Sequence, residues 1–364
     1  MASSQRSLRV AVVGATGVAG QQFLVALGEH PWFKLTRLAA SERSAGKSYK
    51  EAITDASSGA TRWFCDKPCP APFLKLPVEL AEKLTLDDVD LVFTALESDA
   101  AKVVEPLYAK KVPVISTASA FRYEEDVPIF LPGVNPEHAG LIEGQRKGRG
   151  FRGFISPGPN CTTVGLAISL KPLHDAFGIE CVLMTSLQAV SGAGRSPGVL
   201  SYDILDNVIP FIPKEEEKVE KETRKILGAF QGGKIAPAAF RVSCTCTRVN
   251  VLDGHTECVF VSLKRKAGLD DVKKVWRESY RELVSGKLPS APPEMVHYTE
   301  EPFRPQPRLD RELHEGMATV IGRLREDPVL PNGIKYVLLS HNTKMGAAKG
   351  AILTAEYLIQ RGVI

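Results

Sequence analysis

The sequence has no long hydrophobic run and no block of like charge, and each absence excludes a class of protein. No apolar run reaches the roughly 20 residues that a membrane-spanning helix requires. The N-terminal residues lead directly into a strand-like segment, without the apolar core of a signal peptide. The formal net charge is only +4, and no basic block is long enough to suggest nucleic acid. We therefore expect a cytoplasmic protein that binds neither membranes nor nucleic acid.

Paired cysteine motifs of the metal-binding or disulfide kind are also missing. The seven cysteines are an odd number scattered along the chain, which argues against a disulfide framework and favours a reducing compartment. Cys65 and Cys69 form a C-x3-C pair, and Cys244 and Cys246 form a C-x-C pair. Neither has a second pair or a histidine at zinc-finger spacing, so we expect no metal site.

What the sequence does have is enough length for two domains, and the first half has an alternating pattern. Strand-like and helix-like segments follow one another, which predicts a Rossmann-like, doubly wound parallel sheet. The strand pattern occurs at 8–13, 34–40, 89–94 and 112–116, and the helix pattern at 21–27 and 100–110.

The pattern changes after Pro157 to longer strands rich in β-branched residues. This predicts an α+β catalytic and dimerisation domain, with an antiparallel sheet that could serve as a dimer surface. The domain boundaries that we expect are 1–159 with 342–364 for the first domain and 160–341 for the second. The expected strands are 181–190, 239–250 and 257–264, the helices 214–227, 269–283 and 343–360, and the irregular segment 286–307.

A glycine-rich turn follows the first strand. Gly14, Gly17 and Gly20 have the spacing G-x-x-G-x-x-G and lie between a strand and a helix, as in the opening of a nucleotide-binding βαβ unit. After the next strand come donors and a cation, Ser41, Arg43 and Ser44. They favour the 2′-phosphate of NADP, although Glu42 could instead bind the ribose of NAD.

One cysteine has a context that favours chemistry. Cys161 follows a Pro-Gly turn and begins an apolar helix-like run, so the N-terminus of the helix would favour its thiolate. The preceding residue, Asn160, can offer an amide donor to an oxyanion or a phosphate. For a lone cysteine, a buried structural role is the commoner alternative.

Residues further along the chain could form a site with this cysteine. His255 follows a Gly turn at a strand end, and Arg248, seven positions earlier, could clamp a carboxylate. A second Gly-rich loop, 191–194, follows the strand that ends near Gln188. Glu215 and Lys218 share one helical face and could present an acid and a base to a zwitterion. His341 stays a candidate for the cofactor pocket, and we expect the other histidines on the surface: His30, His138, His174, His297 and His314.

Together these motifs resemble those of aspartate-semialdehyde dehydrogenases over nearly the whole chain. The Asn-Cys-Thr-Thr context is more similar to the archaeal and fungal branch than to the common bacterial one. The resemblance implies a nucleophile, an acid/base and a residue that orients a thioester, which are Cys161, His255 and Gln188. It implies Arg248 for the substrate carboxylate and Glu215 for its ammonium group, and the neighbouring Glu216 and Glu217 leave the second assignment open.

The resemblance implies further ligands for phosphate and for NADPH. Phosphate would contact Asn160, Lys218 and Arg122. The cofactor would contact residues of both Gly-rich loops and the segments near them: Gly14, Thr16, Gly17, Val18, Ser41, Arg43, Ser44, Ser191, Gly192, Gly194 and Asn342.

The implied reaction is the NADPH-dependent conversion of L-4-aspartyl phosphate to L-aspartate 4-semialdehyde and phosphate, in the aspartate pathway to lysine, threonine, methionine and isoleucine. The resemblance also implies a homodimer or homotetramer. Three alternatives stay open: a malonyl-CoA reductase on the same scaffold, a non-enzymatic Rossmann-type binding protein, and N-acetyl-glutamyl-phosphate reductase. The last is disfavoured because it has Gly-Cys-Tyr where this chain has Asn160-Cys161-Thr162.

Overall fold

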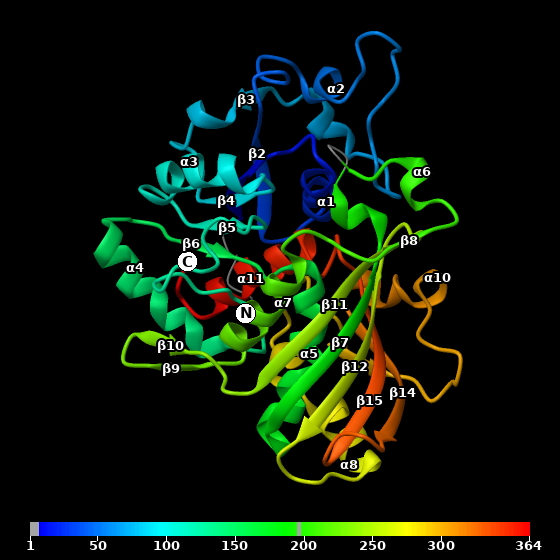
Figure 1. The fold of residues 1–364 in the computed structure, drawn as a ribbon. Helices are drawn as coiled ribbons and strands as arrows, with labels where there is room; N and C mark the ends of the chain where they lie inside the picture. The colour runs from blue at the N-terminus through cyan, green and yellow to red at the C-terminus, as the bar shows by residue number, and fades with distance from the viewer. Residues whose placement is uncertain (1–6, 195–197) are drawn as a thin grey trace. The chain divides into compact units, whose positions relative to one another are not determined.

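The structure is a computed structural model that describes residues 7–194 and 198–364. The chain forms two compact units (Figure 1). The first comprises the chain up to Pro128 together with Ala139–Gly158 and Ala351–Ile364, and the second comprises Ile129–His138 and Pro159–Gly350. The parallel and mixed sheets that define these units confirm the predicted fold class.

The first unit contains a six-stranded sheet in the order β3-β2-β1-β4-β5-β6, and every neighbouring pair is parallel. This is the strand order of a doubly wound dinucleotide-binding fold. The strands are β1 (Leu8–Val13), β2 (Phe33–Ala40), β3 (Val78–Leu80), β4 (Leu91–Thr94), β5 (Val114–Ser116) and β6 (Ile155–Pro157).

Helices connect these parallel strands, as parallel pairing requires. The α-helices are α1 (Val18–Leu27), α2 (Tyr49–Ala52), α3 (Ser98–Ala109), α4 (Leu141–Arg149) and α11 (Ala348–Gln360). Short 3₁₀ helices occupy η1 (Ala71–Lys75), η2 (Ala81–Lys83) and η3 (Pro136–Gly140). The predicted helix 343–360 is therefore too long at its start, because Gly346 N–H bonds to the His341 carbonyl (2.9 Å) in a turn before the helix.

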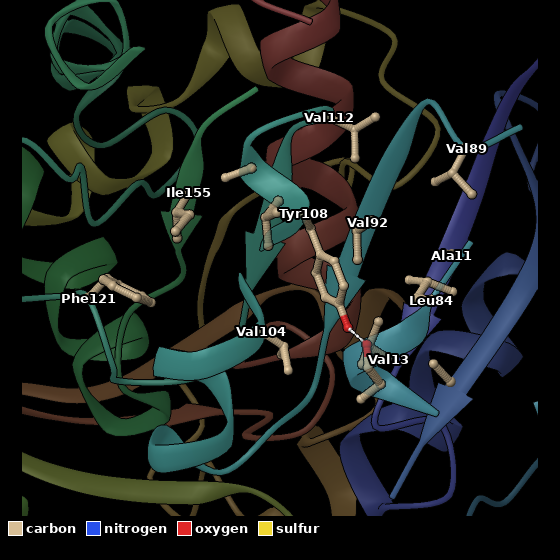
Figure 2. Packing of buried hydrophobic residues seen from close by; sticks show 14 of the residues in the cluster. Ala11, Val13, Leu84, Val89, Val92, Val104, Tyr108, Val112, Phe121 and Ile155 are labelled. Carbon is tan, nitrogen blue, oxygen red and sulfur yellow. Dashed lines mark hydrogen bonds between the residues drawn. The ribbon is translucent and has the colours of Figure 1, made fainter. Parts of the chain in front are cut away.

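The core of the first unit lies between the sheet and its helices. All four residues of β4 are buried, which explains its continuous apolar run. Figure 2 shows Tyr108 of α3 lying across this cluster near Val92 and Val104. Its hydroxyl donates to the Ala81 carbonyl, so the one polar atom of this buried ring is satisfied.

A buried carboxyl joins two strand ends in this unit. Glu105 of α3 accepts hydrogen bonds from the hydroxyls of Thr94 and Ser116, both at 2.6 Å. Burial raises the pKa of Glu105 to about 7, against the lowering effect of those two hydrogen bonds. The carboxyl ends of β4 and β5 are thus held together by a group that titrates near neutrality.

The second unit contains a seven-stranded sheet in the order β13-β14-β15-β12-β7-β11-β8. The predicted antiparallel sheet is wrong: the sheet is mixed, because β11 pairs parallel with β7 and β13 parallel with β14. The chain between β7 and β11 includes helix α7, which supplies the crossover that a parallel pair needs. The strands are β7 (Ile179–Gln188), β8 (Val208–Ile209), β11 (Arg241–Val249), β12 (His255–Leu263), β13 (Val296–Tyr298), β14 (Thr319–Asp327) and β15 (Gly333–Ser340), with a separate hairpin of β9 (Ala229–Gln231) and β10 (Lys234–Ala236).

Helix α5 (Cys161–Phe177) is the centre of the second unit. It packs against β7, β12, β14 and β15 and against two other helices, and most of its residues are buried. The predicted helix 269–283 is instead two helices, because Tyr280 has a φ of 62° and interrupts the chain. The other helical segments are η4 (Val190–Ala193), α6 (Ser201–Ile204), α7 (Glu215–Ile226), α8 (Leu269–Glu278), α9 (Arg281–Ser285), α10 (Pro307–Asp310) and η5 (Leu313–Gly316).

Two further expectations are tested here. His138 is fully buried rather than on the surface, with its ring nitrogens 2.9 Å from Asn135 Nδ2 and from the Gly228 carbonyl. Among the residues that the structure describes, no helix combines the length and apolarity needed to span a membrane.

Candidate active site

Three of the predicted site residues lie side by side at one end of the second sheet. Arg248 of β11 pairs with Gln188 of β7. The pairing of β12 with β7 begins at Thr256 and Leu187, so His255 lies one position beyond, next to Gln188. Gln188 lies 60 positions before Arg248 and 67 before His255 in the sequence. The three residues form a single row because their strands are neighbours in the sheet.

Cys161 faces this row from the first turn of α5. Its Sγ atom lies 3.2 Å from His255 Nε2. Asn160 is the N-cap of the helix, and its Oδ1 accepts from the backbone N–H groups of Thr162 (3.0 Å) and Thr163 (3.3 Å). The thiol is half-buried and lies at the positive end of the helix, where a thiolate is favoured.

His255 is fully buried and held by the backbone. Its Nδ1 accepts the Ala189 N–H at 3.1 Å. Burial, together with the nearby Arg248 and His341, lowers the pKa of His255 to about 3. The imidazole is therefore neutral at physiological pH.

Arg248 is bound to the carbonyl of the same residue, Ala189, which belongs to the next peptide unit. Its Nη1 donates to the Ala189 carbonyl at 2.8 Å. Burial lowers the pKa of Arg248, while Cys161 and Glu215 act in the opposite direction. Within the described part of the chain no salt bridge neutralises this guanidinium, so it can bind a carboxylate from outside.

Glu215 is the one of the three consecutive glutamates that faces the cysteine turn. Its Oε1 accepts from Asn160 Nδ2 at 2.8 Å, and Lys218 Nζ lies 3.4 Å from Oε2. Glu216 is instead bound to the backbone N–H of Cys246 (3.0 Å), and Glu217 is exposed. The structure thus gives the three acids different environments.

Sequence analysis missed two groups that hold this site. Glu222 is fully buried, and its Oε2 accepts the Asn160 N–H at 2.6 Å. It lies seven residues after Glu215 on the buried face of α7, a helical spacing that could have identified it. The second group is the backbone of Ala189, whose N–H binds His255 and whose carbonyl binds Arg248.

A second buried row lies beneath the first. Cys246, Ser186 and Glu257 are paired across β11, β7 and β12. Gln188 Nε2 donates to Ser186 Oγ at 3.2 Å, so this row supports the amide above it. Burial raises the pKa of Glu257 well above its usual range.

The second Gly-rich loop lies against the side chains of Arg248 and His255. A Cβ on Gly192 would be 2.9 Å from Arg248 Nη1 and 3.1 Å from His255 Cε1. Asn342 accepts from Gly254 N–H (2.9 Å) and donates to Ser191 Oγ (2.8 Å), joining two loops. Gly194 has a φ of 67°, and the rest of the loop, residues 195–197, lies outside the described residues.

The first Gly-rich loop fits a dinucleotide in the first unit. A Cβ on Gly14 or on Gly20 would lie 2.1 Å from a backbone carbonyl oxygen. Among the described residues, the one atom within 4 Å of a Cβ added at Gly17 would be the Gly14 carbonyl oxygen, at 3.5 Å. This exposed backbone is therefore open to a ligand at the start of α1. A pyrophosphate at a helix N-terminus requires this combination: two glycines that allow close backbone packing and one that leaves room for the phosphates. Thr16 and Val18 flank Gly17 and are partly exposed.

The remaining predicted residues of the first unit differ in exposure. Ser41 and Arg43 are exposed in the turn after β2, whereas Ser44 is buried, with its N–H 2.9 Å from the Ser41 carbonyl. Glu42 is exposed as well. Arg122 is buried, and its Nη2 donates to the Thr117 carbonyl at 3.0 Å.

Comparisons with known proteins agree with this geometry. Residues 9–142 match the family model "Semialdehyde dehydrogenase, NAD binding domain", and residues 170–345 match "Semialdehyde dehydrogenase, dimerisation domain". The aspartate-semialdehyde dehydrogenase of Methanothermobacter thermautotrophicus is 47% identical, over 96% of this chain and 99% of that protein. The chain belongs to the aspartate-semialdehyde dehydrogenase family. The Saccharomyces cerevisiae member of the family is 40% identical over 97% of this chain and 98% of its own length, so the predicted archaeal and fungal affinity is confirmed.

Solved structures of aspartate-semialdehyde dehydrogenases have the same fold. The Candida albicans enzyme, solved with NADP, has a TM-score of 0.87 at 38% identity, covering 98% of this chain and all of that one. A Vibrio cholerae enzyme complexed with ASA has a TM-score of 0.77 at 26% identity, covering 98% and 99% of the two chains. The family membership makes this chain an oxidoreductase with a nicotinamide-binding and a dimerisation domain.

Proposed function

We propose that this chain converts L-4-aspartyl phosphate, NADPH and a proton to L-aspartate 4-semialdehyde, phosphate and NADP, reversibly, through a thioester on Cys161. The observation that carries this proposal is the thiol at a helix N-terminus, 3.2 Å from a neutral buried histidine and close to a buried, unneutralised Arg248. The names of the relatives support the substrate. Lysine, threonine, methionine and isoleucine are the end products that we propose for the pathway.

Recognition of the aspartyl group would use the charges around the cysteine. Arg248 would bind the substrate α-carboxylate through its planar guanidinium. Glu215 would bind the ammonium group, since it is buried beside the cysteine turn while the two adjacent glutamates are not. Lys218 and Asn160 would contact phosphate, and for Arg122 we keep the phosphate role that the family implies.

We propose NADPH as the cofactor, held in a domain of residues 1–159 with 342–364, and catalysis in residues 160–341. When bound, NADPH supplies the hydride that reduces the thioester. The contacts that we propose are the open backbone and flanking residues of the first loop, the donors after β2, and the second loop with its partner: Gly14, Thr16, Gly17, Val18, Ser41, Arg43, Ser44, Ser191, Gly192, Gly194 and Asn342.

This chain's own residues account for the remaining steps. The Cys161 thiolate attacks the acyl carbon, a C–S bond forms, and phosphate leaves. Gln188, held by Ser186, would orient the thioester carbonyl. His255 supplies the proton-bearing group beside the reacting carbon. After reduction the C–S bond breaks, and the aldehyde leaves with the thiolate restored.

A second copy of the chain is the partner that we propose, in a homodimer or homotetramer. The outer face of the mixed sheet has a cavity of about 350 Å³ lined partly by Leu183, Phe260 and Val329. Leu183 and Val329 are exposed apolar side chains within the matched dimerisation domain. We also propose a cytoplasmic location, in keeping with seven cysteines that are all free.

A pair of assays tests the proposed reaction against its nearest rival. Aspartate semialdehyde with NADP and phosphate should support turnover, and malonyl-CoA with NADPH should not. NAD in place of NADP measures the coenzyme preference in the same assay. Turnover with malonyl-CoA alone would replace this proposal with a malonyl-CoA reductase, and activity with neither substrate would favour a binding protein.

A variant then tests the nucleophile. Cys161→Ser should bind NADPH with an unchanged Kd and lose nearly all turnover, because a hydroxyl is a far weaker nucleophile than a thiolate. Cys181→Ser, on the outer face of the sheet, is the matched control and should keep normal turnover. Substantial activity in a folded Cys161→Ser enzyme would contradict the thioester route.

A further inference from the structure

We propose that the buried Glu105 is a positioning residue for Arg122, and that its ionisation weakens the binding of phosphate at that guanidinium. This inference rests on the proposed function, which assigns Arg122 to phosphate, and it adds a group that the proposed reaction does not use. Two features of the first unit support it. One is a chain of hydrogen bonds from Glu105 to Arg122, and the other is the charge that Arg122 places near the carboxyl.

Glu105 fastens the turn that holds Arg122. Its Oε1 accepts from the hydroxyls of Thr94 and Ser116, at the carboxyl ends of β4 and β5. The backbone N–H of Thr117, the next residue, donates to the Thr94 carbonyl at 3.0 Å. The Thr117 carbonyl in turn accepts from Arg122 Nη2 at 3.0 Å. The carboxyl and the guanidinium are therefore joined through the one turn that follows β5.

The second carboxyl oxygen of Glu105 has no such support. The side chain is fully buried, and among the described residues Oε2 has no hydrogen-bond partner. The groups that face this carboxyl are the two hydroxyls from β4 and β5, Tyr108 from its own helix, and Arg122 from the segment after β5. Burial raises the pKa of Tyr108 above its usual value, so of these groups Arg122 alone is charged. An ionised Glu105 is thus compensated by Arg122.

Phosphate and the Glu105 carboxylate therefore act on the same guanidinium. Burial raises the pKa of Glu105 to about 7, while its two hydrogen bonds and the positive charge of Arg122 act in the opposite direction. A phosphate bound at Arg122 offsets that positive charge, so it favours the protonated carboxyl. By linkage, the protonated carboxyl favours phosphate by the same factor. Phosphate affinity should therefore fall as pH rises and Glu105 loses its proton.

Binding of inorganic phosphate, measured by titration calorimetry from pH 5.5 to 8.5, tests this without turnover. Glu105→Gln is neutral at every pH and keeps an oxygen that can accept from both hydroxyls. The titration of phosphate itself cancels in the ratio of Kd values, wild type over variant. We expect this ratio to rise about fivefold across the range, at the lower end of ordinary coupling between sites. A constant ratio would overturn the proposal.

Two further variants separate this role from a purely structural one. Thr94→Val keeps the shape of the side chain but removes a hydrogen bond that lowers the pKa of Glu105. The fall in phosphate affinity should therefore move to higher pH, and a fall that stays in place would contradict the proposal even if Glu105→Gln fails to fold. Glu143→Gln, exposed on α4, is the matched control and should bind phosphate as the wild type does at every pH. Circular dichroism and NADPH binding show that each variant is folded.

Arg122→Gln distinguishes a failure of this inference from a failure of the proposed function. It should weaken phosphate binding by about tenfold or more, because a charge-assisted contact is lost. In that background Glu105→Gln should change the Kd no further. Unchanged affinity in Arg122→Gln would overturn the phosphate role of Arg122 and this inference with it, whereas a loss there with a constant wild-type ratio would overturn this inference alone. Failure of the wild type to turn over aspartate semialdehyde would count against the proposed reaction and would leave these binding measurements unaffected.

Discussion

The two Gly-rich loops of this protein look alike in the sequence, but their glycines are required for different reasons. In the first loop, Gly14 and Gly20 face backbone carbonyl oxygens that a Cβ would approach to 2.1 Å. In the second loop, Gly192 faces the side chains of Arg248 and His255. The first loop is therefore constrained by backbone packing, and the second by the side chains of the candidate site. A glycine's role follows from what its missing Cβ would contact.

Gly20→Ala should produce the largest effect, because the backbone of the first loop cannot move away from the new Cβ. We expect a loss of about 4 kcal/mol or more in the free energy of unfolding. Urea denaturation measures this loss. Gly144→Ala is the matched control, since no atom of the described residues would lie within 4 Å of its Cβ. Equal stability of the two variants would show that the backbone around Gly20 does not require a glycine there.

Glu105→Gln tests whether the buried carboxyl that binds the end of β4, next to the first loop, titrates near neutral pH. Thr94, which Glu105 holds, directly precedes Ala95, whose carbonyl faces Gly14. The pKa of Glu105 is about 7 in the folded state and ordinarily 4.5, so the folded state binds more protons than the unfolded state between these pH values. The stabilising contribution of Glu105 is therefore complete below pH 4.5 and lost as pH rises through 7.

The amide of Glu105→Gln does not titrate, so this pH dependence should disappear. Relative to the wild type, the variant should gain about 3 kcal/mol between pH 4.5 and 8. Denaturation at several pH values checks the difference. Parallel stability curves for the two proteins would show that Glu105 does not titrate as described.

Gly192→Ala should damage catalysis and spare folding. The new Cβ must displace the Arg248 guanidinium from the Ala189 carbonyl or turn the His255 ring, and a misplacement of about 1 Å can cost about 10²-fold in rate. We expect kcat to fall by about that factor while the melting temperature changes little. If Gly192→Ala lost as much stability as Gly20→Ala, the glycine of the second loop would also be required for folding, and the two loops would not differ.

Gly17→Ala should have the smallest effect. Its Cβ would meet only the Gly14 carbonyl at 3.5 Å, so the fold tolerates it, but the methyl group would occupy the approach of a pyrophosphate. We expect the Kd for NADPH to rise about tenfold, or about 1.4 kcal/mol. Fluorescence titration measures the Kd. Unchanged affinity would place the pyrophosphate away from Gly17.

The sequence alone predicted the elements that follow local rules. The strand, Gly turn and helix of 8–27 were predictable from periodicity and loop spacing, and so was Cys161 at the head of a helix. Arg248, Gln188 and His255 could each be predicted as site residues from the sequence. Their arrangement in one row could not, because strand order and register depend on contacts between distant segments.

Other parts of the site left no local signal. The parallel pairing of β11 with β7 was missed, since β-branched strands look alike in either direction. The role of Ala189 could not be found, because its backbone acts and its side chain carries no chemistry. Glu222 was hidden in a charged helical run that resembles a solvent-exposed face.

The backbone of Ala189 has a consequence for how this enzyme could diversify. The N–H and the carbonyl of this one residue, in two adjacent peptide units, orient His255 and Arg248, so the proposed acyl chemistry and the proposed recognition of the substrate carboxylate cannot drift apart independently. A change of substrate that needs Arg248 moved would have to rebuild the backbone at Ala189 and would disturb the histidine with it. New specificities on this scaffold should therefore arise by replacing whole side chains on α7, which reaches the substrate side without touching the shared anchor.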